Sequence, residues 1–361
     1  MERCRSSILG CVPTETAAVL SEPSLNEISL AAIRTAARTI APYVVRTPTL
    51  PLDRLSADLG RPVVGKFELL QHTGSFKVRG AFHRMQQLTE AERAAGVVAV
   101  SGGNHGLAVA YAARVLGIEA SVIMPATAAP ASVKQVRADG AHLILMDTIA
   151  EVFARSVAEV EAGKVLVHPF DDPAVVVGQG TVGLELHEDA PEITDVLVSV
   201  GGGGLITGVA AALQALDPAI RVWGVETEGA DVMSRSLRAG EPVTLDPITS
   251  IATTLGAPTV APLTLAGVRA LVEEVLVVPD AEAVRGIEML AATAKVVAEP
   301  ATGCTWAAAL RLRDRLPAEA RLALVLCGGN AGLDDIAGWR ARFPAGPISQ
   351  PTSPDDLDSN V

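Results

Sequence analysis

The stretch Gln71–Ala81 (QHTGSFKVRGA) places a lysine where a helix is expected to begin. Thr73 or Ser75 can cap a helix that starts at about Phe76, which puts Lys77 in the first turn. The helix dipole disfavours a cation there. Lys77 is therefore either a solvated surface lysine or an amine held partly neutral. A neutral amine is a nucleophile that can form a Schiff base with an aldehyde.

Two glycine-rich loops follow expected strands and open expected helices. Ser101–Gly106 (SGGNHG) is the first, and the four glycines of Gly201–Gly204 are the second. Consecutive glycines let backbone N–H groups converge, and a following helix favours an anion such as a phosphate. The alternative is a tight turn that allows close packing. A phosphate loop together with a depressed lysine suggests a phosphorylated aldehyde cofactor, for which pyridoxal phosphate is the obvious candidate.

Two further glycine patterns carry weaker signals. Gly60–Lys66 fits most of a nucleotide-triphosphate loop, but Phe67 stands where a Ser or Thr must coordinate magnesium. Gly178–Gly183 (GQGTVG) matches the dinucleotide-binding pattern, and Asp195 lies near the distance where a ribose-binding acid is sought. Asp195 precedes its expected strand instead of ending it. A nicotinamide-dependent dehydrogenase remains an alternative on this pattern alone.

Short, almost entirely apolar strands alternate with helical patterns along most of the chain. The expected strands are Val97–Val100, Ala120–Met124, His142–Met146, Val165–Val167, Val196–Val200, Arg221–Val225, Val275–Val278 and Leu322–Leu326. Apolar strands separated by helices predict parallel sheets covered on both faces. No long linker interrupts this alternation, so two interleaved α/β units are favoured over separate domains in a row.

Composition excludes several functional classes. The chain has 361 residues, with 29 Lys plus Arg against 41 Asp plus Glu, and only 3% aromatic residues. This balance argues against nucleic-acid and anionic-membrane binding. No run of 18 apolar residues lacks charge, so we expect no membrane span. Cys4, Cys11, Cys304 and Cys327 have neither zinc-site nor disulfide-framework spacing, and free thiols suggest a cytoplasmic protein.

Five motifs occur in an order that resembles the serine/threonine dehydratases, pyridoxal-phosphate enzymes of the tryptophan-synthase β fold (fold type II) related to serine racemase. They are Thr73–Ala81, Ser101–Gly106, Gly201–Leu205, Glu299–Pro300 and Cys327–Asn330, and His168–Asp172 and Gly178–Thr181 match as well. The resemblance spans about residues 31 to 333. It implies two interleaved three-layer α/β/α domains with mostly parallel sheets, and it makes Gly178–Thr181 a helix start instead of a dinucleotide loop.

The resemblance also implies a role for each matching residue. Lys77 would be the Schiff-base lysine and the base at Cα, with Phe76 beside the pyridine ring and Asn104 on its 3′ oxygen. The phosphate would be held by Gly201, Gly202, Gly203, Gly204 and the amide of Leu205, and Cys327 would face the pyridine nitrogen. The substrate carboxylate would be bound by the loop that contains Ser101, Gly102, Asn104 and His105. Glu299 would lie near the cofactor without an assigned role.

These assignments imply an ammonia-lyase that converts a β-hydroxy amino acid (L-threonine, L-serine or a relative) into a 2-oxo acid and ammonia. A thiol cannot protonate the ring nitrogen as a carboxylate does, so a long-lived carbanion is disfavoured and prompt loss of the β-hydroxyl is favoured. Racemases of the family carry a serine where this chain has Gly102, which disfavours racemisation. An amino-acid racemase or other isomerase, and a catalytically silent binding protein, are the alternatives.

Two departures of this sequence from the family pattern concern a cation site and the choice of substrate. Glu226 and Ala230 match two of the three groups of a divalent-cation site seen in racemase-like members, but Val232 stands at the third, so no metal ligand is assigned. A divalent or monovalent cation stays an open question. Many dehydratases read Ile-Ala-Asp-Gly where this chain has Ile251–Thr254 (IATT), which indicates a substrate other than serine or threonine, for example a bulkier or acidic one.

The resemblance finally predicts a domain division and an assembly. Residues 25–95 and 170–345 would form a large cofactor-binding domain, and residues 96–169 a small substrate-side domain. Residues 1–24 and 346–361 would be flexible termini. We expect a cytoplasmic homodimer that acts on a small-molecule amino acid and binds neither nucleic acid nor membrane.

Overall fold

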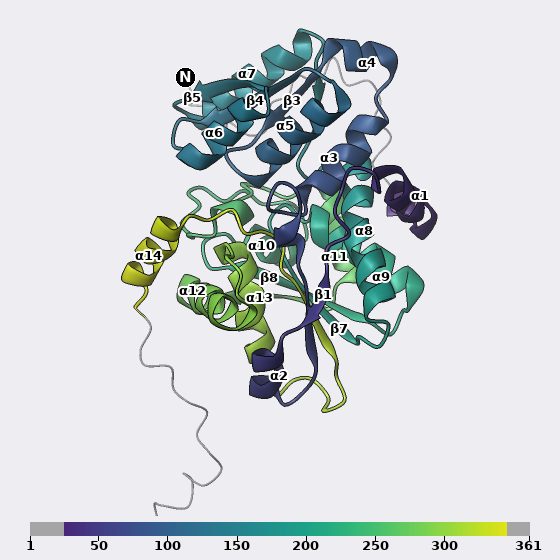
Figure 1. Cartoon of the computed structure of the whole chain (residues 1–361), viewed down its shortest axis with the longest axis vertical. Helices are drawn as coiled ribbons and strands as arrows, with labels where there is room; N and C mark the ends of the chain where they lie inside the picture. The colour runs from purple at the N-terminus through teal and green to yellow at the C-terminus, as the bar shows by residue number, and fades with distance from the viewer. Residues whose placement is uncertain (1–24, 345–361) are drawn as a thin grey trace, which may run out of the picture.

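The computed structural model describes residues 25–344, which contain two β-sheets (Figure 1). The larger sheet has the strand order β1-β2-β10-β7-β8-β9. Its strands are β1 (Thr49–Pro51), β2 (Val63–Lys66), β10 (Leu322–Val325), β7 (Asp195–Ser199), β8 (Arg221–Thr227) and β9 (Glu274–Val278). Strand β1 pairs with β2 in antiparallel orientation, and the other neighbours pair in parallel.

The smaller sheet is entirely parallel and has the order β5-β4-β3-β6. It consists of β3 (Val97–Val100), β4 (Ala120–Pro125), β5 (His142–Met146) and β6 (Val165–Leu166). All four strands come from the continuous segment 97–166, and Figure 1 shows this sheet above the larger one. The mostly parallel α/β architecture is the one the sequence predicted.

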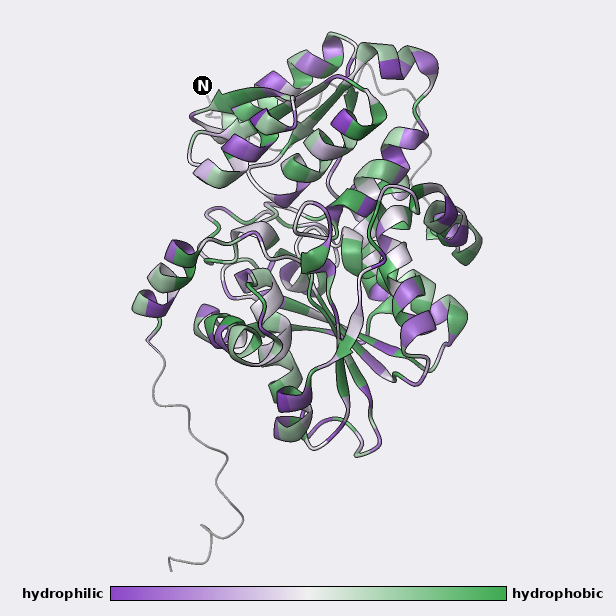
Figure 2. Cartoon of the chain, in the orientation of Figure 1, coloured by the Kyte–Doolittle hydropathy of each residue, from purple (hydrophilic) through white to green (hydrophobic). Residues whose placement is uncertain are grey.

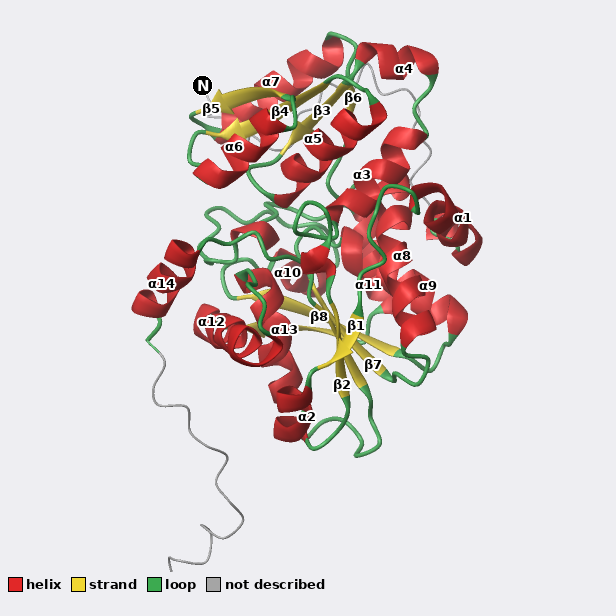
Figure 3. Ribbon diagram, in the orientation of Figure 1, coloured by secondary structure: helices red, strands yellow, loops and turns green. Residues whose placement is uncertain are grey.

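Helices cover both faces of the larger sheet, as Figure 3 shows for α13 on one side and α9 on the other. The helices are α1 (Leu30–Ile40), α2 (Asp53–Leu59), α3 (Lys77–Gln86), α4 (Glu90–Ala95), α5 (Asn104–Leu116), α6 (Pro130–Ala138), α7 (Ile149–Glu161), α8 (Pro173–Asp189), α9 (Gly204–Leu216), α10 (Val232–Ala239), α11 (Pro262–Leu271), α12 (Asp280–Met289), α13 (Pro300–Arg311) and α14 (Leu333–Arg342). Short helical turns lie at Leu25–Glu27, Glu68–Leu70 and Thr253–Leu255 (η1 to η3), and a π-turn at Leu290–Ala294 (η4).

The central strands are mostly apolar because both of their faces are covered (Figure 2). Every residue of β7 and of β10 is buried. The largest hydrophobic cluster joins these strands to α9 and α13. A second cluster packs α3 and α5 against β3 and β4. The two sheets therefore have separate cores, and α3 belongs to the core of the smaller sheet.

The motif Gly178–Thr181 lies in the interior of α8, so the expectation that it starts a helix is wrong. The helix begins at Pro173, and the Asp172 side chain caps it by accepting two backbone N–H groups. A Cβ on Gly178 would lie 2.7 Å from the Cα of Gly80 on α3. The glycines of α8 thus serve close helix packing, and no dinucleotide loop exists at this position.

Several predictions concern residues outside the described range: those for Cys4 and Cys11, and the flexible segments 1–24 and 346–361. Cys304 and Cys327 are buried free thiols. Among residues 25–344, no helix is long and apolar enough to cross a membrane.

Candidate active site

Lys77 is the first residue of α3, as the sequence predicted, but neither Thr73 nor Ser75 caps the helix. The backbone N–H of Phe76 donates instead to the carbonyl of Cys327, at 3.1 Å. Ser75 forms a β-bridge with Gly328, in the loop after β10. This backbone pairing joins the start of α3 to the larger sheet. It also leaves the hydroxyls of Thr73 and Ser75 buried without a hydrogen-bond partner.

The Lys77 amine contacts the segment that joins β6 of the smaller sheet to α8. Its Nζ donates to the carbonyl of Pro169 at 2.9 Å and lies 5.2 Å from the centre of the Phe76 ring. Burial lowers the pKa of Lys77 to about 8, and Cys327 and Glu299 only partly offset that effect. The amine is therefore far easier to deprotonate than a solvated surface lysine.

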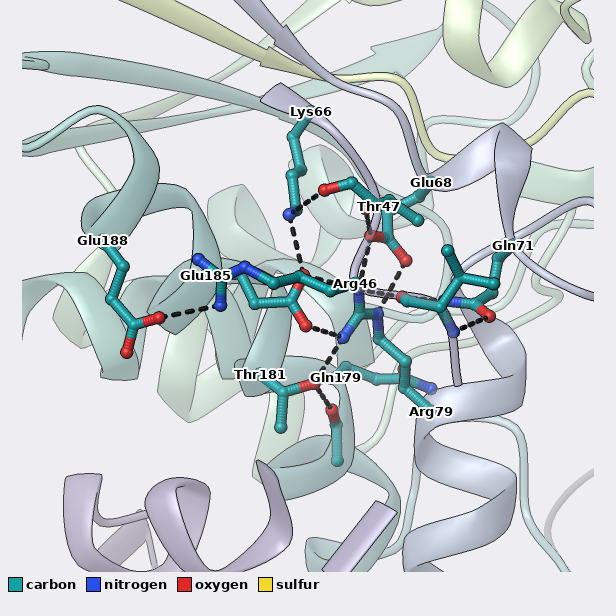
Figure 4. A network of polar contacts seen from close by, with 12 residues as sticks. Arg46, Thr47, Lys66, Glu68, Gln71, Arg79, Gln179, Thr181, Glu185 and Glu188 are labelled. Atoms are coloured by element: carbon teal, nitrogen blue, oxygen red, sulfur yellow. Dashed lines mark hydrogen bonds and ion pairs between the residues drawn. The ribbon is translucent and has the colours of Figure 1, made fainter. Parts of the chain in front are cut away.

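A network of buried charges fixes α3 from the other side (Figure 4). The Arg79 guanidinium, two residues after Lys77, is fully buried. It donates to Glu68 in η2 at 2.8 Å and to Glu185 on α8 at 2.7 Å. Glu185 also accepts from the buried amine of Lys66 on β2, at 2.7 Å. One cation thus connects the helix that carries Lys77 to both α8 and η2.

The four glycines Gly201–Gly204 connect β7 to α9, as predicted. Gly203 has a φ of 90°, which favours glycine, and a Cβ on Gly202 would lie 2.2 Å from the ring of Phe170. The first N–H groups of α9, including that of Leu205, have no carbonyl partner earlier in the helix. A loop without side chains in front of a helix N-terminus is a suitable cradle for a phosphate.

Asn104 begins α5 in the loop Ser101–Gly106, and its side chain contacts the larger sheet unit. Its Nδ2 donates to Glu299 Oε1 at 2.9 Å, and its Oδ1 accepts from Asn330 Nδ2 at 2.7 Å. Glu299 also accepts from the hydroxyl of Thr254, at 3.1 Å. Burial raises the pKa of Glu299 to about 7, while these two donors act in the opposite direction.

His105 and Ser101 use their side chains within the protein. The His105 ring is buried, and its Nε2 donates to the carbonyl of Val167 at 2.7 Å. Burial lowers the pKa of His105 to about 3, with nearby Lys77 acting in the same direction, so the ring is neutral. Ser101 Oγ accepts from the N–H of Gly103 at 3.1 Å. The loop therefore offers a ligand its backbone N–H groups, at the N-terminus of α5.

Cys327 follows β10 and is buried beside Ser199 and Thr302, whose hydroxyls lie 3.2 and 3.3 Å from its sulfur. Burial, with the Glu299 charge next in size, raises the pKa of Cys327 to about 12. The thiol consequently stays protonated and uncharged at neutral pH. The role expected for Cys327, opposite a pyridine nitrogen, requires such a neutral group.

The structure places Lys77 near Cys327 and Glu299, and Asn104 in contact with Glu299. Thr73, Ser75, Phe170 and Asn330 stood in the quoted motifs without a role in binding, whereas Thr254 was recorded only as a departure from the family pattern. Glu226, considered for a cation, accepts the N–H groups of Met233 and Ser234 at 2.8 Å. Residues 25–344 contain no cluster of three His, Cys, Asp or Glu side chains able to hold a metal ion.

Comparison with known proteins identifies the family. Residues 40–328 match the family model described as pyridoxal-phosphate dependent enzyme, and the chain belongs to this family. Its cofactor is pyridoxal phosphate. The residues present fit this group: the Lys77 amine has a lowered pKa and contacts Pro169, and the next residue, Phe170, packs against Gly202 of the glycine loop. The hydroxyls of Thr73 and Ser75, shortly before Lys77, are buried without a partner.

Three relatives illustrate the range of activities among similar proteins. An L-threonine ammonia-lyase of Thermotoga maritima is 39% identical over 86% of this chain and 77% of its own length. An L-threo-3-hydroxyaspartate ammonia-lyase of a Pseudomonas species is 37% identical over 84% of this chain and 95% of its own length. The structure of maize serine racemase has a TM-score of 0.82 and 37% identity, and covers 87% of this chain and 97% of its own. These matches confirm the predicted fold class.

Proposed function

We propose that this protein is a pyridoxal-phosphate-dependent ammonia-lyase, a carbon-nitrogen lyase that converts a β-hydroxy amino acid into a 2-oxo acid and ammonia. The observation that carries the proposal is the Lys77 amine, whose pKa is lowered to about 8, beside a Cys327 thiol that stays protonated. The relatives named as ammonia-lyases support the same reaction class.

When bound, pyridoxal phosphate supplies an electron sink for negative charge at the substrate Cα. In the proposal, Gly201, Gly202, Gly203, Gly204 and the Leu205 amide hold its phosphate. Phe76 would pack beside the ring, Asn104 would donate to the 3′ oxygen, and Cys327 would face the ring nitrogen. The neutral thiol leaves no formal charge partner at that nitrogen, which favours prompt elimination over a long-lived carbanion.

Lys77 would be the nucleophile that attaches the cofactor and, once the substrate amine has displaced it, the base at Cα. A base with a pKa of about 8 is well matched to neutral pH, because an appreciable share is deprotonated. Nζ would take the α-proton, and a proton would be returned to the β-hydroxyl as it departs as water, which leaves an enamine. That enamine tautomerises to an imine and hydrolyses to the 2-oxo acid and ammonia.

The substrate carboxylate would bind at the N-terminus of α5, on the loop that contains Ser101, Gly102, Asn104 and His105. Backbone N–H groups and the helix dipole favour an anion there. Gly102 offers no side-chain acid to protonate the second face of Cα, so elimination is proposed over racemisation. The resemblance implies a serine at this position in racemases of the family, where this chain has Gly102.

The substrate is proposed to be L-threonine, L-serine or a relative, including an acidic one. The departure from the family pattern at Thr253 and Thr254 supports testing an acidic substrate, and so does the name of one relative, which specifies hydroxyaspartate.

We also propose a cytoplasmic homodimer without nucleic-acid or membrane partners. The excess of acidic residues is in keeping with the absence of such partners. The proposed small domain, 96–169, contains the whole smaller sheet, and 25–95 with 170–345 would form the large domain.

The proposal is tested by incubating the holoenzyme separately with L-serine, L-threonine and L-threo-3-hydroxyaspartate. Release of 2-oxo acid and ammonia in equal amounts from at least one of them is expected. Chiral chromatography of the remaining amino acid checks the alternative. Formation of the D-enantiomer without 2-oxo acid would contradict the lyase assignment and identify a racemase.

A further inference from the structure

Thr254 links the larger sheet unit to the residues around Asn104. It lies in the turn η3, and its hydroxyl donates to Glu299 Oε1 at 3.1 Å. The same carboxylate oxygen accepts from Asn104 Nδ2 at 2.9 Å. Thr254 is exposed, whereas Glu299 is buried. The hydroxyl of an exposed residue therefore contacts a buried carboxylate that holds the first residue of α5.

The contacts of Asn104 define which way its amide faces. Its Oδ1 accepts from Asn330 Nδ2, which also donates to the carbonyl of Thr73 at 2.8 Å. Its Nδ2 faces Glu299, which can only accept when ionised. A flipped amide would set oxygen against carboxylate and nitrogen against nitrogen. Nδ2 lies within hydrogen-bond distance of both Glu299 oxygens, at 2.9 and 3.2 Å, so Glu299 and Asn330 together enforce one orientation of the amide.

Thr254 also faces the smaller sheet unit directly. A Cβ placed on Gly103 would lie 3.7 Å from the methyl group of Thr254, and no other neighbour would lie within 4 Å. The two functional groups of Thr254 thus have separate directions: the hydroxyl holds Glu299, and the methyl faces the loop that precedes Asn104. Substitutions can remove one group and keep the other.

We propose that Thr254 is a positioning residue that, by donating to Glu299, holds this carboxylate against Asn104 and fixes the amide that donates to the cofactor's 3′ oxygen. The last contact rests on the proposed function. Thr254 itself touches neither the cofactor nor the reacting atoms in this scheme, and acts through Glu299.

The proposal has a pH signature because a donor to a carboxylate favours its ionised form. The other titratable groups that act on Glu299 or respond to it are Lys77 on α3, Cys327 after β10 and Cys304 on α13. Neither thiol ionises near neutral pH, since burial raises the pKa of both. In the proposed holoenzyme the Lys77 amine is bound to the cofactor and does not titrate as a free amine. Among these groups Glu299 is therefore the one that changes charge near pH 7, and loss of the Thr254 hydroxyl should move its transition upward.

The test compares Thr254→Val, which keeps the shape and removes the hydroxyl, with Thr254→Ser, which keeps the hydroxyl and removes the methyl. The visible absorbance of each holoenzyme is titrated with pH, without substrate. We expect Thr254→Val to raise the transition midpoint by about one unit, the size expected for loss of one hydrogen bond to a charged group. Thr254→Ser should retain the wild-type midpoint. Thermal unfolding of both variants should match, since the side chain is exposed.

Equal midpoint shifts in the two variants would overturn the proposal, because the methyl group would then be responsible. An unchanged midpoint in Thr254→Val, or a wild-type absorbance that does not change around neutral pH, would overturn it too. The titration needs no turnover. If no β-hydroxy amino acid is consumed but the two variants still differ as expected, the ammonia-lyase assignment fails and the positioning role stands.

Discussion

Burial of the Lys77 amine deprives its ammonium form of hydration, and the negative groups nearby do not compensate fully. The resulting pKa of about 8 compares with an ordinary value of 10.5. Only the neutral amine attacks an aldehyde. Burial of this single side chain therefore makes its amine nucleophilic near neutral pH.

The capture of pyridoxal phosphate by the apoenzyme should therefore follow the deprotonation of Lys77. Below pH 8 the ammonium predominates, so the rate should rise about tenfold per pH unit as the pH increases and should level off near 8. Stopped-flow absorbance of apoenzyme mixed with cofactor measures this. A rise that continues toward the ordinary lysine value of 10.5 would show that Lys77 is solvated.

Gly202 offers a second test at the scale of one residue. A Cβ there would collide with the Phe170 ring, at 2.2 Å. Gly202→Ala should weaken cofactor binding by about tenfold or more, as a few tenths of an ångström of displacement at a preorganised anion site suggests. Adding Phe170→Leu should restore part of the affinity by making room. Equal affinities of wild type and Gly202→Ala in an equilibrium titration would rule out this loop as the phosphate cradle.

The residue types of the site could largely be predicted from the sequence, while their mutual contacts could not. Lys77, Asn104 and the glycines Gly201–Gly204 stand in short local patterns that signal chemistry. Glu299 was recognised only as near the cofactor, because its partners Thr254 and Asn104 are 45 and 195 residues away in sequence. The cap expected from Thr73 or Ser75 failed for a similar reason, since pairing with the distant loop at Cys327 replaced it.

At the scale of elements, closely packed helices carry Lys77 and the glycine loop Gly201–Gly204. Helix α8 lies against both α3 and α9, and glycines occur where the backbones meet. A Cβ on Gly208 of α9 would lie 2.3 Å from the carbonyl of Val176 on α8. The pattern in Gly178–Gly183 could not be assigned from sequence because glycine serves tight loops and close helix contacts equally well.

Gly208→Ala should therefore destabilise the protein by about 1–3 kcal/mol, the usual cost of overpacking. Gly338→Ala is the matched control, because Gly338 also lies in a helix and has no neighbour within 4 Å of a new Cβ. That control should be neutral or stabilising by up to about 1 kcal/mol through helix propensity. Urea denaturation of both variants measures these changes in stability. Equal denaturation midpoints for the two variants would contradict the packing role of Gly208.

The charge network around Arg79 fixes α3 against α8 and η2 (Figure 4). Arg79→Met should cost about 3–5 kcal/mol of stability, because the buried carboxylate of Glu68 loses its counter-charge. The double variant Arg79→Met/Glu68→Gln should be more stable than the single one, since the unpaired charge is gone. Denaturation curves that order the two variants the other way would refute this interpretation.

At the scale of the whole molecule, the site lies where the carboxyl ends of strands from both sheets meet. Gly201–Gly204 follow β7, Cys327 follows β10 and Ser101–Gly106 follow β3. Ligands of open α/β sheets bind at such ends, and here two sheets contribute. The alternating apolar strands predicted the parallel sheets. The orientation of the two sheets toward each other depends on long-range contacts, which no local sequence pattern contains.

The central claim is that the Lys77 amine binds the aldehyde of pyridoxal phosphate while the glycine loop holds its phosphate. Absorbance spectroscopy of purified protein after incubation with the cofactor and removal of the excess tests it most directly. The account predicts a visible band in the wild type that borohydride reduction fixes to a peptide containing Lys77, and no such band in Lys77→Ala. A wild-type protein that stays colourless, or a reduced adduct on another lysine, would contradict it.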